Sequence, residues 1–448
     1  MLRYVFPILI GKLVKRAVLL LRPGGGTAIP GRVVERLAPG LLAKILAQPP
    51  RGVVVVTGSS GKSTTTKMVA AVLRAHGMDV FTNRFTANVT RGMLSELLDV
   101  IDWRGRLGHE IAVMEMDEGY SAITTEQVPA RVLVLLNVMV DQLHRWFEPE
   151  RVASYLERAA RATAESVVVN RDDPQLRLIA QRLPERPGRT LRYFGVSDEV
   201  LRTVPRGLGS AADFSGLASA PLPPGAGASE VIGFEGTHAV IAVSATAAQP
   251  EATVDIELPS RGVHFATDSA AAIEAGRAVL GDAFDPEVAA EALASIPTVF
   301  GRGEKTLVEG EPVEFVLTKS PTSIQINLDY LEPDIEQIYV AVGKDIFDAS
   351  QLWISDWSSL GHADMVSGWQ TWDSALKLHY DNVATDRVEP DIERATREFF
   401  DRPAPLHGVK TVIFTPESMR RMRRLLGFFY ADTAAKDGAS GEGRRGKP

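Results

Sequence analysis

The residues best suited to chemistry lie in one short segment rich in glycine and hydroxyl groups. It follows a run of valines and reads Thr57, Gly58, Ser59, Ser60, Gly61, Lys62, Ser63 and Thr64. Glycines permit a tight turn whose N–H groups point at phosphate oxygens, while Lys62 adds a cation and Ser63 a hydroxyl for Mg²⁺. The general pattern has a glycine where Val56 stands, so this is a shortened phosphate loop, with a chance glycine-rich turn as the alternative. We predict that all eight residues bind a nucleotide, with Lys62 catalytic and Ser63 also a metal ligand.

A second group consists of carboxylates at the end of a hydrophobic segment. Glu115, Asp117 and Glu118 follow the apolar run Ile111–Met114. A carboxylate at the carboxyl end of a parallel strand, beside a phosphate loop, is placed to hold the nucleotide's Mg²⁺ directly or through water. A solvated acidic turn is the plainer alternative. Glu115 emerges first from the strand and is the predicted magnesium ligand.

Two further predicted strand ends are polar. After Asn137, Asp141 and His144 are three residues apart and share one face of any helix there. They would serve as metal ligands or as a base with its orienting group, whereas a histidine beside a tryptophan is more often a packing residue. Asn170 ends the next strand, although the Asp173-Pro pair after it is also how a helix begins.

Two later positions bear on the same chemistry. Arg302 lies at the junction between two regions of alternating strands and helices. An arginine there can neutralise charge on a transferring phosphoryl group, or it can form an interdomain salt bridge. Residues 348–357 mix carboxylates and indoles, a composition typical of a site or an interface.

The elements that must position these groups alternate along the chain. Apolar runs at Val53–Val56, Glu110–Met114, Val132–Leu136 and Ser166–Val169 are separated by segments of helical period such as Lys62–His76. Continuous apolar strands between helices predict a mostly parallel sheet covered on both faces. The predicted fold class is therefore α/β, with a central parallel sheet that carries the phosphate loop.

A second, smaller α/β domain is predicted from residue 301 to 430, with strands at Glu314–Leu317, Ile338–Val342 and Thr411–Phe414. The first 48 residues form an N-terminal helix and hinge, and residues 49–300 form the central domain. Within it, Pro205–Ser229 is dominated by Gly, Ala, Pro and Ser, which predicts a surface insertion, and ordered pattern resumes at Thr253–Leu258. Residues 431–448 have nothing to bury, and we expect a disordered tail.

The composition of the chain excludes several classes of function. The 448 residues include 49 Lys and Arg against 56 Asp and Glu, a net charge of −7, so no nucleic-acid partner is predicted. The absence of Cys excludes disulfides, cysteine-bound zinc and a thiol nucleophile. With 45% hydrophobic residues, the chain has the composition of an ordinary globular protein.

The N-terminal segment is the exception to this charge balance. Its longest uncharged stretch, Tyr4–Gly11, is too short to cross a bilayer. We expect an amphipathic helix, which either packs on its own domain or contacts a membrane through residues 1–22. The cations available to anionic headgroups would be Arg3, Lys12, Lys15, Arg16 and Arg22.

The ordered series of motifs resembles the Mur ligase family, and within it the MurT type of lipid II isoglutaminyl synthase, over nearly the whole chain. The shared segments are Thr57–Thr66, Thr82–Arg84, Glu115–Glu118, Asn137 with Asp141, Phe300–Arg302 and Asp348–Ser350. The resemblance implies a ligase in which ATP phosphorylates a carboxylate and an amine attacks the acyl phosphate. In the MurT type, ammonia from a GatD glutaminase partner amidates the D-glutamate of lipid II.

Site roles follow from this resemblance residue by residue. It implies that Arg302 lies near the γ-phosphate and that Glu115 and Asp141 join Ser63 at the metal. Asp348, in preference to Asp356, would be lent to the partner's Cys–His pair. It also implies that two further side chains, Asn170 and Asp268, contact the nucleotide. The implied cofactors are ATP and Mg²⁺. The implied location is the cytoplasm, at the inner face of the membrane.

The chain also departs from the MurT pattern. The family's four-cysteine zinc ribbon is replaced by the Pro205–Ser229 insertion, so no zinc is expected. His144 stands where Asp is usual, Asp268 lies in a segment that usually holds two Asn, and Ser320 replaces an Asn. These departures keep a second hypothesis open, namely an ATP-binding scaffold or regulatory paralogue with another substrate or reduced activity.

Overall fold

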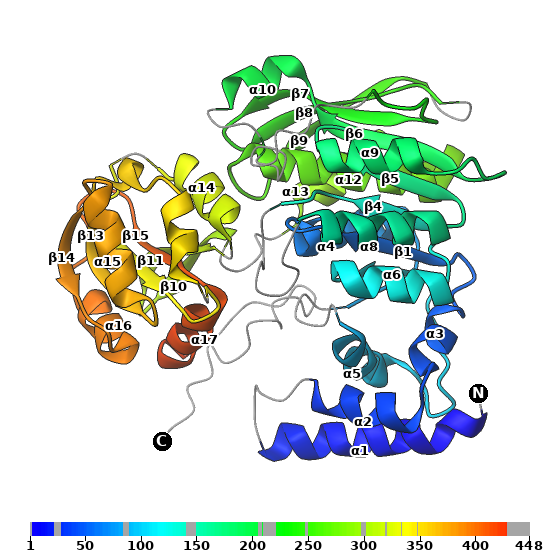
Figure 1. Cartoon of the computed structure of the whole chain (residues 1–448), viewed down its shortest axis with the longest axis horizontal. Coiled ribbons are helices and arrows are strands. Elements are labelled where there is room, and N and C mark those ends of the chain that lie inside the picture. Colours follow the sequence, from blue (N-terminus) through cyan, green and yellow to red (C-terminus); the bar gives the residue numbers. More distant parts are fainter. Residues whose placement is uncertain are drawn as a thin grey trace.

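The computed structural model describes most of the chain as two α/β units (Figure 1). The described residues are 2–21, 28–83, 89–139, 149–204, 208, 221–246, 250–296, 302–318, 320–332, 334–346 and 348–427. Within them, one sheet has nine strands and the other has six. The predicted fold class, a central parallel sheet followed by a smaller α/β domain, is confirmed.

The larger sheet is parallel through most of its width. Its strand order is β2-β3-β1-β4-β5-β6-β7-β8-β9. The bounds are β1 Val53–Thr57, β2 Val80–Thr82, β3 Ile111–Glu115, β4 Val132–Leu135, β5 Ser166–Asn170, β6 Thr190–Val196, β7 Ala228–Glu235, β8 His238–Val243 and β9 Ala252–Glu257. All neighbours pair in parallel except β7 with β8 and β8 with β9. The central strands therefore end at one common edge.

Helices cover both faces of this sheet. Val54 and Val56 of β1 face one core, which they share with α4 (Lys62–Ala75), α12 (Val263–Leu280) and α13 (Pro286–Ala294). Val53 and Val55 face the opposite core. The helices there include α5 Thr90–Val100, α8 Pro149–Ala162 and α9 Pro174–Arg182, with α6 Glu118–Gln127 packed on α8. A strand buried on both sides needs apolar residues at every position, which explains the four consecutive valines.

The predicted insertion, Pro205–Ser229, extends too far toward the C-terminus. Strand β7 begins at Ala228, so the last two residues of Pro205–Ser229 belong to the sheet. The pattern of apolar runs did not predict β2 or β6, nor β7 and β8, which precede Thr253–Leu258. The buried positions of β7 and β8 alternate with more exposed ones, and such short half-polar strands give a weak signal beside a Gly- and Ala-rich stretch.

The smaller sheet has the order β10-β11-β15-β12-β13-β14. Only β10 with β11 is antiparallel among its pairs. Its elements are β10 Arg302–Val308, β11 Glu311–Leu317, α14 Pro321–Asp329, β12 Ile338–Val342, η3 Ala349–Ile354, η4 Ser358–Leu360, β13 His362–Gly368, α15 Thr371–Tyr380, β14 Ala384–Val388, α16 Ile392–Phe400, β15 Lys410–Phe414 and α17 Pro416–Leu425. The edge strand β14 escaped prediction because most of its side chains face solvent and are polar.

The N-terminal helix packs on its own domain. It follows a single turn, η1 (Leu2–Tyr4), and α1 (Val5–Leu21) lies against α2 (Ile29–Leu37) and α5, with α3 (Leu41–Leu46) next along the chain (Figure 1). Lys12 Nζ donates to the carbonyls of Leu98 and Ile101 at 2.7 Å each, and Lys15 Nζ donates to Ser95 O at 2.6 Å. Lys12 caps the end of α5 and Lys15 bonds within α5, to Ser95 O and, at 2.7 Å, to Asp99 Oδ2, so the expectation that they are available to headgroups is wrong. None of the described helices is long and apolar enough to cross a membrane.

Candidate active site

The predicted phosphate loop lies between β1 and α4, at the carboxyl edge of the larger sheet. Gly58 has a φ of 139° and Gly61 a φ of 80°, conformations that other residues rarely adopt. Gly61 is the N-cap of α4, so the positive end of the helix dipole faces the loop. A Cβ on Gly61 would lie 2.5 Å from Oδ1 of Asp268 on α12. Glycine is therefore required both by the turn and by the close approach of α12.

Asn137, just beyond β4, holds the loop in place. Its side-chain oxygen accepts a hydrogen bond from Ser60 N at 2.8 Å, and its Nδ2 donates to Ser60 O at 3.2 Å. Its carbonyl accepts from Ser59 N at 3.1 Å, and Ser59 Oγ accepts from Met139 N at 3.0 Å. The structure thus gives Asn137 a positioning role, which the sequence analysis had not distinguished from a direct chemical one.

Lys62 lies at the start of α4 with its ammonium directed to the loop. Nζ donates to Glu118 Oε1 at 3.0 Å, to Ser59 O at 3.1 Å and to Gly58 O. The Lys62 and Glu118 side chains are only 11% and 5% exposed, so this ion pair is weakly screened by solvent. The sequence analysis named Glu118 only as part of an acidic strand end. Its pairing with Lys62 depends on the approach of α6 to α4, which no local pattern reveals.

Ser63 and Glu115 form a buried oxygen pair under the loop. Ser63 Oγ donates to Glu115 Oε2 at 2.8 Å, and the two residues are 4% and 3% exposed. Asn83 fixes the end of β3, because its side chain accepts from Glu115 N at 2.8 Å and donates to Glu115 O at 3.0 Å. The two residues that the sequence analysis assigned to the metal are therefore in direct contact.

The donor set of this pair fits Mg²⁺. Magnesium takes hard oxygen ligands and is usually held by one or two protein groups together with waters and phosphate oxygens. Within the part of the chain that the structure describes, no group of three or more His, Asp or Glu side chains is arranged to hold a metal. Ser63 and Glu115 would hold the ion jointly with the nucleotide. Asp141, the third predicted ligand, lies outside the described residues, as does His144.

The remaining predicted nucleotide contacts lie along the same edge. Thr57 and Thr64 are buried, and Thr57 Oγ1 finds no hydrogen-bond partner among the described residues. Asn170 is 6% exposed and donates to Leu136 O at 2.8 Å, which ties the end of β5 to that of β4. The proximity of Asp268 to Gly61 places a carboxylate beside the loop.

Arg302 and Asp348 belong to the smaller domain. Arg302 begins β10, where its backbone pairs with Val316; the structure does not describe its side chain. Asp348 is the exposed N-cap of η3, and its Oδ1 accepts from Ser350 N at 2.9 Å. Hydrogen bonds from the Ser350 side chain and backbone hold the pKa of Asp348 below its usual range.

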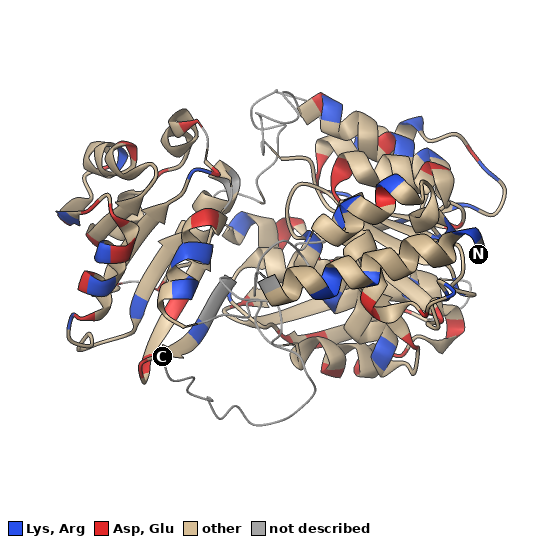
Figure 2. Ribbon diagram, turned by 90° about the horizontal axis from the view of Figure 1, so that it is seen from below, with Lys and Arg blue, Asp and Glu red and all other residues tan. Residues whose placement is uncertain are grey.

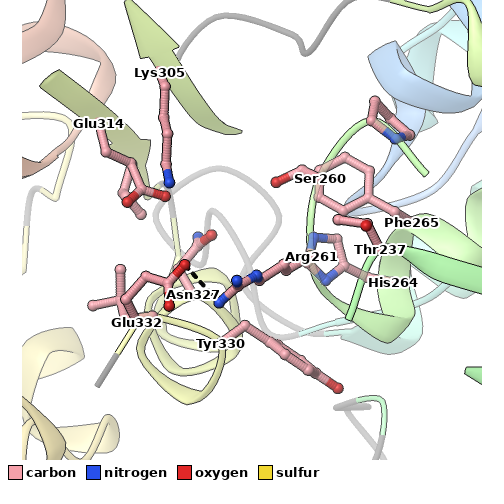
Figure 3. Close-up of a pocket in the computed structure, with 13 residues that line it drawn as sticks. Thr237, Ser260, Arg261, His264, Phe265, Lys305, Glu314, Asn327, Tyr330 and Glu332 are labelled. Atoms are coloured by element: carbon pink, nitrogen blue, oxygen red, sulfur yellow. Dashed lines mark ion pairs between the residues drawn. The ribbon is translucent and has the colours of Figure 1, made fainter. Parts of the chain in front are cut away.

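A cavity of about 410 Å³ lies between the two domains (Figure 3). Arg261 and His264 reach it from the central domain, and Lys305, Glu314 and Glu332 reach it from the smaller one. Arg261 Nη1 and Glu332 Oε1 form an ion pair across it at 2.7 Å. The sequence analysis did not predict this cavity, because its walls come from segments far apart in the chain.

The cavity is lined by a partly buried carboxylate, that of Glu314, and by aromatic rings. Burial raises the pKa of Glu314, which Lys305 counteracts in part, and Glu314 Oε2 has no hydrogen-bond partner within the described chain. The rings of His264 and Tyr330 meet edge to face with centroids 6.2 Å apart. His264 and Asp268 are four residues apart on α12 and so share a helix face. The cavity and the phosphate loop are thus joined by one turn of α12.

Comparison with known proteins identifies the class. Residues 56–213, which include the phosphate loop and Glu115, match the Mur ligase middle domain. A solved structure of MurF ligase from Thermotoga maritima in complex with ADP has the same fold, with a TM-score of 0.60 and 21% identity over 90% of this chain and 84% of that chain. Residues 56–213 thus carry a Mur ligase middle domain, as the motifs in that part of the chain had indicated.

Particular relatives include the MurT subunit of lipid II isoglutaminyl synthase (glutamine-hydrolyzing). The Staphylococcus aureus protein is 26% identical over 149 residues, which are 33% of each chain. The Streptococcus pneumoniae protein is 28% identical over 156 residues, which are 35% of this chain and 34% of the relative. The chain thus matches about a third of the length of these relatives.

Proposed function

We propose that this chain is an ATP-dependent ligase that joins a carboxylate to an amine through an acyl phosphate. The observation that carries the proposal is the buried contact between Ser63 and Glu115, 2.8 Å long, directly beneath a glycine loop and beside Lys62. A hydroxyl, a carboxylate and an ammonium grouped at a helix N-terminus form a site for a metal-bound polyphosphate. The Mur ligase middle domain over residues 56–213 supports the same assignment.

In the proposed reaction the γ-phosphoryl group of ATP passes to a carboxylate oxygen, and ADP leaves. The amine nitrogen then attacks the acyl carbon, and inorganic phosphate leaves. Lys62 and the loop N–H groups orient the phosphates, and Arg302 neutralises charge on the transferring group. Ser63 and Glu115 hold Mg²⁺, which supplies further charge neutralisation when it is bound.

The nucleoside part of the bound nucleotide is proposed to lie along α12, away from the loop. Asp268 lies against the loop and His264 lines the interdomain cavity one helical turn earlier. A nucleotide with its phosphates on the loop would therefore extend along this face of α12 toward the cavity. Asn170 stands as a further proposed contact at the end of β5.

The amine is proposed to be ammonia from a glutaminase partner of the GatD type. The chain has no Cys, so the thiol of such a glutaminase would belong to another subunit. Asp348, the residue proposed to join the partner's catalytic pair, is exposed at the start of η3. Asp356 is less exposed than Asp348, and its Oδ1 likewise accepts from the serine two residues on, from the backbone and hydroxyl of Ser358 at 3.0 and 2.6 Å.

An exposed aromatic patch beside Asp348 suits such a partner. It comprises Trp353, Ile354, Trp369, Trp372, Leu376 and Tyr380, each at least 42% exposed. Residues 372, 376 and 380 recur every four positions along one face of α15, and the rings of Trp353 and Tyr380 meet with centroids 5.1 Å apart. Large aromatic side chains are the usual anchors of protein–protein interfaces. This aromatic patch is the proposed docking surface for the glutaminase.

The proposed substrate is the D-glutamate carboxylate of lipid II or a related cell-wall precursor, and the proposed location is the cytoplasm. The test combines the purified chain with its glutaminase partner, ATP, Mg²⁺, glutamine and lipid II. ADP and amidated product should appear together, and both should be lost with Lys62→Ala. A partner that binds without any turnover of this mixture would overturn the ligase assignment.

A second candidate is an ATP-binding scaffold or regulatory paralogue. It is favoured by Asp268, which lies beside the phosphate loop in a segment where the MurT type usually holds two Asn. Ser320, another departure, caps α14 through a hydrogen bond from Ser323 N at 3.3 Å and so has a structural role. ADP release separates the two candidates. Both bind ATP, which calorimetry measures, but the scaffold releases no ADP with any carboxylate substrate.

A further inference from the structure

Helix α1 carries a continuous apolar stripe on its outer face. Phe6, Leu9, Leu13 and Leu20 are 70%, 49%, 69% and 83% exposed. With Ala17, which is also exposed, they recur every three or four residues and so form one line along the helix. No described part of the chain covers this stripe, which is long for an exposed apolar surface on a globular domain.

The orientation of α1 is fixed by its opposite face. Ile8 is fully buried there, and Gly11 lies so close to α2 that a Cβ would be 2.3 Å from Val34 Cγ2. Lys12 and Lys15 reach past this contact to backbone carbonyls of α5 and of Ile101 at its end. The helix cannot turn its stripe inward without breaking these hydrogen bonds, so the exposure of the stripe is built into the fold.

The charges that α1 itself carries have one sign, although Lys15 is paired with Asp99 of α5 at 2.7 Å. No Asp or Glu precedes Glu35 in the sequence, although the whole chain has a net charge of −7. Figure 2 looks onto this face of the molecule, and α1 carries only basic colour there. Arg3, in the turn η1 that precedes α1, and Arg16, on one flank of the stripe, are both exposed.

We propose that α1 lies flat on an anionic membrane surface, with the stripe inserted at the boundary between headgroups and acyl chains and Arg3 and Arg16 at the phosphates. An amphipathic helix with an apolar stripe and basic flanks is the form that binds such interfaces. A second copy of the chain is a poorer occupant, because pairing two such faces would bring arginines together without a carboxylate to balance them. This inference does not rest on the ligase assignment.

The test measures flotation of the full chain with lipid vesicles. Binding is expected to vesicles of phosphatidylglycerol and phosphatidylcholine, to fall with added salt, and to be weak with phosphatidylcholine alone. The double variant Phe6→Glu with Leu13→Glu should lower binding roughly tenfold or more, because it loses buried apolar surface. Leu406→Glu changes a leucine that is 89% exposed in the other domain and should bind as the unmodified chain does.

A charge variant and a folding control complete the experiment. Arg3→Glu with Arg16→Glu should remove the preference for phosphatidylglycerol, and all variants should keep the thermal unfolding midpoint of the parent. Absence of binding by the unmodified chain, or equal binding by the Phe6 and Leu13 variant, would overturn the proposal. So would sedimentation showing that the stripe instead pairs two copies and that Leu13→Glu separates them.

Discussion

At the scale of single residues, the candidate site consists of two contacts between side chains. Ser63 and Glu115 share one buried hydrogen bond, and Lys62 shares a second contact with Glu118. The proposed ligase reaction needs positioning and charge neutralisation more than a protein nucleophile. Each of these residues is therefore expected to affect turnover far more than stability.

Glu115→Gln should lower Mg²⁺-dependent turnover of ATP by about a hundredfold or more. The amide keeps the shape of the side chain and still accepts a hydrogen bond from Ser63, but it loses the charge that is proposed to hold the metal. Steady-state ADP release at varied Mg²⁺ measures the effect. Glu126→Gln removes a surface carboxylate that pairs with Arg158 and serves as the control. Unchanged Mg²⁺ dependence in the Glu115 variant would exclude it as a ligand.

At the scale of elements, buried polar groups join helices to the sheet. Glu274 on α12 is fully buried and accepts from Arg192 Nε at 2.5 Å, Ser229 Oγ at 2.6 Å and Arg277 Nη1 at 2.8 Å. Arg192 belongs to β6 and Ser229 to β7. This network therefore holds α12, which also carries Asp268, against the sheet.

Glu274→Gln should lower the free energy of unfolding by about 3–5 kcal/mol, because Arg277, only 2% exposed, would lose its carboxylate. Chemical denaturation measures the change. Glu291→Gln, on the exposed face of α13, should change the free energy of unfolding by less than about 0.5 kcal/mol. A loss in the Glu274 variant no larger than in this control would show that the network contributes little.

The turn after β5 predicts a pH dependence. Burial raises the pKa of Asp172 from 3.8 to about 6, although its Oδ2 accepts from Val196 N at 2.7 Å. The folded state therefore binds the proton of the Asp172 carboxyl more tightly than the unfolded state does. The contribution of Asp172 to the free energy of unfolding is fully present below pH 3.8 and is lost as pH rises to about 6. The loss amounts to at most about 3 kcal/mol, at about 1.4 kcal/mol for each pKa unit.

Unfolding free energies of the parent and of Asp172→Asn, measured by urea denaturation across this range, test the prediction. The difference between the two should shift in favour of the variant as pH rises, because the amide has no proton to lose. Two parallel pH profiles would contradict a raised pKa at this residue.

At the scale of the whole molecule, two α/β units meet around the interdomain cavity. The ion pair between Arg261 and Glu332 spans it, but these side chains are 50% and 39% exposed, so its net contribution to stability is small. The proposed partner surface lies on the smaller unit and the phosphate loop on the larger one. Nucleotide binding and partner binding should therefore be separable by mutation.

Trp372→Ala should weaken binding of the glutaminase partner by about tenfold or more, because a tryptophan in an interface is often an anchor. ATP binding should be unchanged. Trp103→Ala is the matched control, since Trp103 is 51% exposed but lies in the central domain. Surface plasmon resonance for the partner and calorimetry for ATP provide the two readouts, and equal partner affinity in both variants would remove the aromatic patch from the interface.

The sequence by itself determined the α/β class and the glycine loop between a strand and a helix, and it assigned Ser63 and Glu115, which the structure brings into contact, to one proposed metal site. These follow from local signals, namely continuous apolar strands, glycines at a turn and polar residues at strand ends. It did not reveal β2, β6, β10 or β13, nor β7, β8 and β14, whose half-polar strands are recognised only when a neighbouring strand pairs with them.

Only the tertiary structure decided which groups face one another. It brought Glu118 to Lys62 and Asp268 to Gly61, made Asn137 the support of the loop, and turned Lys12 and Lys15 onto α5 while leaving the apolar stripe of α1 outside. Each of these contacts joins segments that are distant in the chain. Their formation depends on how whole helices pack, which the spacing of residues along one segment does not specify.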